Sequence, residues 1–63
     1  MGFNERQMTA IKLIKEKGMI SLSDLKAVYL QVVDRTLNRD LQALVSKKVV
    51  KAEGEKKGRH YRL

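Results

Sequence analysis

The chain has 63 residues, enough for one small domain, and its fourteen basic and seven acidic side chains give a formal net charge of +7. It has no cysteine, which excludes a disulfide or a thiolate metal site, and the single histidine, His60, cannot hold a metal alone. No run of about 18 apolar residues exists, so the sequence predicts no membrane-spanning helix and no membrane partner. We expect neither a metal nor another cofactor.

A first helix is predicted over about residues 5–17. Asn4 is a favourable N-cap, and Gln7 follows at the spacing of a capping box, in which each side chain bonds the other's free backbone N–H. Phe3, just before the cap, is expected to pack on Met8, and Gly18 is expected to end the helix. The stripe expected to face the core comprises Met8, Ala10, Ile11, Leu13 and Ile14.

The next segment predicts a strand stub and a second helix. Met19-Ile20 is short and apolar, and Ser21 with Asp24 forms a second capping-box pattern before a helix over about 22–30. The segment 31–33 is predicted to form the tight turn to the next helix, because its β-branched residues Val32 and Val33 disfavour helix. The side chains expected to be buried here are Leu22, Leu25, Val28 and Tyr29.

A third helix is predicted over about 35–47, with Asp34 as its N-cap. Its expected buried face comprises Leu37, Leu41, Leu44 and Val45. Asp40 lies at the border of that face, and we interpret it as structural, paired with a lysine of a neighbouring helix.

The last segment predicts a β-hairpin, with strands at about 49–52 and 59–63 and a polar loop over 53–58. Tyr61 is expected to pack on the first or third helix. Three helices followed by a hairpin predict one α+β domain over residues 1–63, a winged helix-turn-helix.

The positive charge is concentrated in the second half of the chain. Residues 32–63 carry nine basic and four acidic side chains, whereas residues 1–31 carry five and three. A basic half indicates a polyanionic partner, and the second helix of a helix-turn-helix enters the DNA major groove. Arginine can bond guanine twice, Asn or Gln can bond adenine twice, and hairpin cations would meet phosphates or the minor groove. The candidate contacts are Arg35, Thr36, Asn38, Arg39, Gln42 and Ser46 on the helix, and Lys56, Lys57, Arg59 and His60 on the hairpin.

The run 33–45, VDRTLNRDLQALV, resembles the S-x-R-T-x-x-R-D-L-x-x-L helix of DeoR-type winged-helix domains. Residues 4–7 and 54–63 extend the resemblance, which is greatest to the C-terminal module of Fic-family proteins and of RecG-related putative ATP-dependent helicases and transcriptional regulators. It implies a DNA-reading third helix and a domain cut from the C-terminal end of a longer, cytoplasmic and bacterial-type protein, near the nucleoid if prokaryotic. Two positions depart from the family: Val33 replaces a capping Ser or Thr, and Lys48 replaces a glycine.

Catalysis finds no support in the sequence, because no nucleophile has an adjacent base and no phosphate-binding glycine loop is present. We therefore expect a non-catalytic module that binds double-stranded DNA as a monomer, either in transcriptional regulation or as the DNA-binding domain of a helicase-related protein. The alternative is a docking module for a protein or for its own parent chain. Docking would leave an exposed apolar patch, for example along the second helix or the edge strand.

Overall fold

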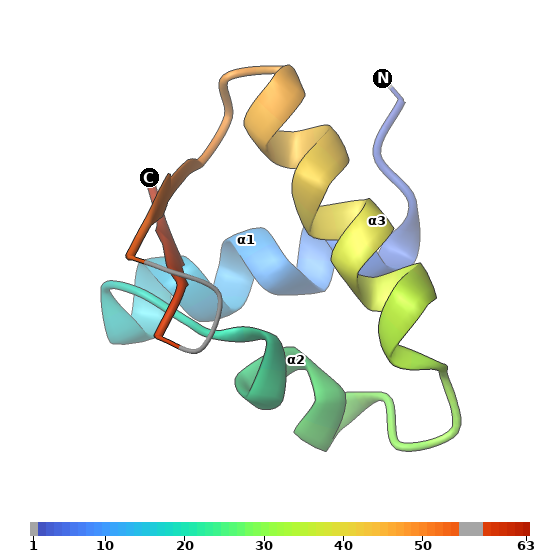
Figure 1. Ribbon diagram of the computed structural model, residues 1–63. Coiled ribbons are helices and arrows are strands. Elements are labelled where there is room, and N and C mark those ends of the chain that lie inside the picture. Colours follow the sequence, from blue (N-terminus) through green and yellow to red (C-terminus); the bar gives the residue numbers. More distant parts are fainter. Residues whose placement is uncertain (1, 55–57) are drawn as a thin grey trace.

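A computed structural model describes residues 2–54 and 58–63. Three helices are followed by a two-stranded antiparallel hairpin, an α+β arrangement consistent with the predicted winged-helix layout (Figure 1). In this view α1 lies behind α3. None of the helices in the described residues is long and apolar enough to cross a membrane. The elements are α1 (Glu5–Lys17), α2 (Leu22–Val28), α3 (Asp34–Ser46), β1 (Lys51–Glu53) and β2 (His60–Arg62).

Helix α1 has the predicted bounds and the predicted capping box between Asn4 and Gln7. Gly18 follows the helix with a φ of 91°, a left-handed conformation that favours glycine. The buried stripe is rotated from the expected one, because Gln7 is buried and Met8 is 60% exposed. The prediction that Met8 lies in the core is therefore wrong. Met8 and Phe3 instead line one shallow hollow on the surface of α1.

Helix α2 is shorter than predicted, ending at Val28 rather than at Leu30. Tyr29, its C-cap, has left helical geometry, and its carbonyl accepts from the Val32 N–H in the turn that follows. With only two turns of helix, Leu25 reaches the core while Val28 is 51% exposed, so the expected burial of Val28 is wrong.

Helix α3 begins one residue earlier than predicted, and the N-cap is Val33 rather than Asp34. Val33 has the extended backbone of a cap residue but makes no side-chain cap bond. Asp34 lies in the first turn instead, where its carboxylate is 3.1 Å from the ammonium of Lys26. The helix ends at Ser46, one residue before the predicted end.

The hairpin starts later than predicted because the two valines before it close the end of α3. The N–H groups of Val49 and Val50 both donate to the carbonyl of Leu44, which leaves Lys51 as the first strand residue. The predicted strand stub is confirmed at Ile20, which exchanges two backbone hydrogen bonds with Tyr61 at 3.0 and 2.7 Å.

One core joins all of these elements. Its buried side chains come from α1, α2, α3, the strand stub and the hairpin, and Tyr61, 2% exposed, places the hairpin against the helices as expected. The core comprises Ala10, Ile14, Ile20, Leu25, Leu37, Leu41, Leu44, Val50 and Tyr61.

Candidate nucleic-acid interface

The outward side of α3 carries most of the predicted helix contacts. Because Leu37, Leu41 and Leu44 are fully buried, the residues on the opposite side of the helix face solvent. We call this set the recognition face, and Thr36, also predicted, is half-buried at its edge. The recognition face consists of Arg35, Asn38, Arg39, Gln42 and Ser46, all of which are exposed.

Asp40, next to this face, is buried and fixes α3 to the start of α1. Its carboxylate accepts from the side-chain amide of Asn4 at 2.9 Å and from the guanidinium of Arg6, and its backbone carbonyl accepts from Gln7. The Asp40 hydrogen bond raises the pKa of Arg6 above its ordinary value. The structural interpretation of Asp40 is thus confirmed, but its partner is an arginine and not the expected lysine.

Lys26 orients the N-terminal end of α3 through contacts with the turn that joins α2 to α3. Its ammonium donates to the Val32 carbonyl at 2.7 Å and also pairs with Asp34. These contacts hold the turn against α2, and they bring a positive charge to the one carboxylate in the first turn of α3. An anion approaching this end of the helix therefore meets less repulsion than an unpaired Asp34 carboxylate would cause.

The ion pairs among the described residues include no side chain of the recognition face. Among the described residues, four ion pairs are formed, and their cations are Arg6, Lys17, Lys26 and Arg62. Within that part of the chain, neither Arg35 nor Arg39 has a carboxylate partner. Two exposed guanidinium groups thus remain available to an external anion on one side of one helix.

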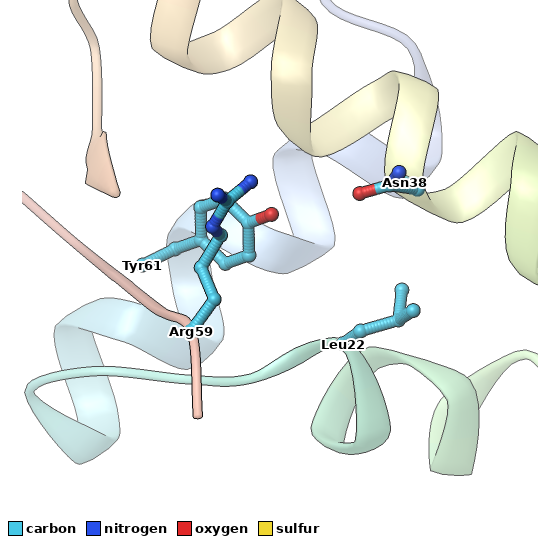
Figure 2. A pocket seen from close by; sticks show the side chains of 4 residues that line it. All are labelled: Leu22, Asn38, Arg59 and Tyr61. Carbon is cyan, nitrogen blue, oxygen red and sulfur yellow. The ribbon is translucent and has the colours of Figure 1, made fainter. Parts of the chain in front are cut away.

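The hairpin contributes a second cationic group beside α3. Arg59 is half-buried and His60 is exposed, whereas Lys56 and Lys57, also predicted as contacts, lie outside the described residues. Arg59 and Asn38 line the same pocket of about 250 Å³ (Figure 2). The fold therefore brings a predicted helix contact and a predicted hairpin contact to one place.

Sequence reasoning missed four residues that shape this region. Leu22 and Tyr61 complete the pocket that Asn38 and Arg59 line, whereas Arg6 holds the middle of α3 and Lys26 its N-terminal end. The capping-box pattern at Asn4 pointed to the start of α1 but gave no sign that it contacts Asp40, 36 residues away. The described residues contain no group of three or more His, Cys, Asp or Glu that could hold a metal ion.

A scan against protein-family models finds no match, and searches of curated proteins and of solved structures find no relative of this chain.

An exposed apolar patch lies at the turn between α2 and α3. Val28, Leu30 and Val33 are 51%, 74% and 61% exposed, and the first two line a shallow hollow with their neighbours. This is the kind of surface that a docking module would present near the second helix. We call these three residues the turn patch.

Proposed function

We propose that this domain binds double-stranded DNA without catalysing a reaction, with α3 in the major groove and the hairpin on flanking phosphates or the minor groove. The observation that carries the proposal is that Arg35 and Arg39 are exposed beside Gln42 on one side of α3 and form no ion pair with a carboxylate of the described residues. The charge of +7 supports a polyanionic partner. The domain would serve transcriptional regulation or a helicase-related parent chain in the cytoplasm.

The proposed mechanism divides the work between charge and geometry. Guanidinium and carboxamide groups on α3 offer paired donors, or a donor and an acceptor, that match guanine and adenine edges in the major groove. The hairpin cations contribute sequence-independent attraction to phosphates, which fixes the position of the domain on the duplex. Asp40, Arg6 and Lys26 would act only by holding α3 in place.

The experiment is a titration of the ¹⁵N-labelled protein with a mixed-sequence duplex at low and moderate salt. We expect amide shifts to concentrate on residues 34–46 and 58–62 and to weaken as salt rises, because phosphate contacts release counterions. An absence of shifts at low salt would contradict the proposal.

The contribution of Arg39 is tested by Arg39→Ala. The exposed side chain makes no described contact, so the fold should be unchanged, and affinity should fall by about 1–3 kcal/mol if the guanidinium bonds a base. Lys12→Ala is the matched control, since it removes one exposed charge from α1, which lies behind α3 (Figure 1). Equal affinity of the two variants, with intact far-UV circular dichroism, would remove Arg39 from the interface.

The turn patch favours a second candidate function, docking of a protein or of the parent chain. Its three side chains expose apolar surface with no described partner. The two functions are separable, because Leu30→Ser should abolish docking while leaving DNA binding unchanged.

A further inference from the structure

The pocket between α3 and β2, lined by Leu22, Asn38, Arg59 and Tyr61, contains a polar group that forms no hydrogen bond with any of the described residues. Tyr61 is 2% exposed, and its ring belongs to the core. None of the described hydrogen bonds involves its hydroxyl, yet no buried side-chain oxygen or nitrogen of the described residues lacks a partner. Tyr61 lines the pocket, and Figure 2 shows its hydroxyl directed toward Asn38.

The polar groups around this pocket are predominantly donors. The guanidinium of Arg59 donates hydrogen bonds and the hydroxyl of Tyr61 can do so. The carboxamide of Asn38 has its oxygen toward Tyr61 in Figure 2, and a half-turn of that amide presents its NH₂ to a ligand. A convergence of donors with one fixed positive charge fits an anion with several acceptor oxygens. Leu22 provides the one apolar wall, against which a carbon skeleton next to that anion could lie.

A stacked base fits the pocket poorly. Base stacking requires an accessible aromatic face, and Tyr61 is 98% covered. The hydroxyl at the end of the ring points toward Asn38 in Figure 2, which suits a hydrogen bond to an oxygen. The choice between a base and a phosphate therefore favours the phosphate.

We infer that this pocket binds one backbone phosphate of DNA, with its oxygens on Arg59, Asn38 and Tyr61 and the adjoining sugar on Leu22. The inference rests on the proposed function and changes one part of it, since Asn38 becomes a phosphate contact instead of an adenine contact. Because the pocket joins α3 to β2, one phosphate bound there fixes the helix and the hairpin on the same strand of the duplex.

The test compares Tyr61→Phe with Tyr29→Phe by fluorescence anisotropy on an A·T-rich and a G·C-rich duplex. Tyr61→Phe keeps the buried ring and should weaken binding roughly tenfold, equally on both duplexes, because it removes one hydrogen bond to a charged group. Tyr29→Phe, whose hydroxyl bonds Thr9 at 2.9 Å between α1 and α2, should bind like the wild type. Thermal unfolding of both variants confirms that each is folded.

Two further variants distinguish the phosphate from a base. Arg59→Gln should reduce the slope of log affinity against log salt by about one, and Asn38→Ala should weaken binding to both duplexes alike. Wild-type affinity in Tyr61→Phe, or an Asn38→Ala defect confined to one duplex, would overturn the inference while the proposed function stands. Failure of the wild type to bind either duplex at low salt would overturn both.

Discussion

Asp40 shows how one buried carboxylate can set the position of a whole helix. Its side chain is 8% exposed and joins α3 to Asn4 and Arg6 at the start of α1. A buried carboxylate stabilises the fold only while its donors remain, because without them it has lost its water and gained no hydrogen bond in return. The same residue in an exposed position would contribute far less.

We therefore expect Asp40→Ala to lower the free energy of unfolding by about 1–3 kcal/mol, since it removes the hydrogen bonds that Asn4 and Arg6 donate to a buried carboxylate. Asp34→Ala is the control on the same helix; that carboxylate is 68% exposed, and its loss should change stability by less than about 1 kcal/mol. Urea denaturation measures both. Equal effects of the two substitutions would contradict the structural role of Asp40.

Lys48 is the residue at which the chain departs from the glycine of the DeoR-type pattern, and it is the one described non-glycine residue with a positive φ, 62°. This left-handed conformation costs a β-carbon-bearing residue about 1–2 kcal/mol. The backbone thus adopts there a conformation suited to glycine although lysine occupies the position.

Lys48→Gly should raise the thermal unfolding midpoint, because relief of the left-handed strain exceeds the extra unfolded-state entropy of glycine, about 0.5–1 kcal/mol. Lys47→Gly, next to it with an ordinary φ of −83°, should lower the midpoint instead. Circular dichroism melting of the two variants decides the matter; shifts of the same sign would show that the backbone angle is not the cause.

At the scale of elements, the sequence predicts best where local chemistry acts alone. The bounds of α1 follow from a capping box and a terminal glycine, both of which act within a few residues. The predictions fail where distant groups compete for the same atoms. Asp34 pairs with Lys26 and does not cap α3. The N–H groups of Val49 and Val50 donate to the Leu44 carbonyl and do not join the strand ladder.

The candidate site follows the same division. Helical periodicity suffices to place Arg35, Arg39 and Gln42 together, because the apolar side of α3 dictates the opposite side. Periodicity contains no information about which strand residue meets that helix. The pocket that joins Asn38 to Tyr61 therefore could not be predicted, and Tyr61 was expected only as a packing residue.

Helix α2, with seven residues, depends on its N-terminal cap more than a longer helix would. The Asp24 carboxylate accepts from the Ser21 backbone N–H at 2.8 Å, and this hydrogen bond lowers the pKa of Asp24 below its ordinary value. A lowered folded-state pKa means that the charged carboxylate stabilises the fold above the unfolded pKa of about 3.9. That stability is lost as the pH falls through the folded value.

Asp24→Asn should therefore be less stable than the wild type at neutral pH, and the difference should vanish as the pH falls below about 4. Ser21→Ala is the control, because it keeps the backbone N–H that Asp24 accepts from and so preserves the pH dependence. Urea midpoints measured from pH 7 to pH 2.5 give the comparison. A difference that is constant with pH would contradict the role of the charge.

At the scale of the whole molecule, the turn patch and the net charge act against each other in self-association. Val28, Leu30 and Val33 expose apolar surface, but three side chains are far from the roughly 1,200–2,000 Å² that a stable interface buries. Two copies that meet at this patch would also bring together two chains of charge +7. Repulsion of this kind weakens with salt, whereas apolar association does not.

The chain should accordingly sediment as a monomer at high micromolar concentration, at low salt and at moderate salt alike. Leu30→Ser, which removes the most exposed of the three apolar side chains, should leave the sedimentation coefficient and the DNA affinity unchanged. A dimer that appears as salt rises and is lost in Leu30→Ser would instead identify the turn patch as an interface between copies. In that case each dimer would present two recognition faces, and its DNA sites would occur as pairs about one helical turn, roughly 34 Å, apart.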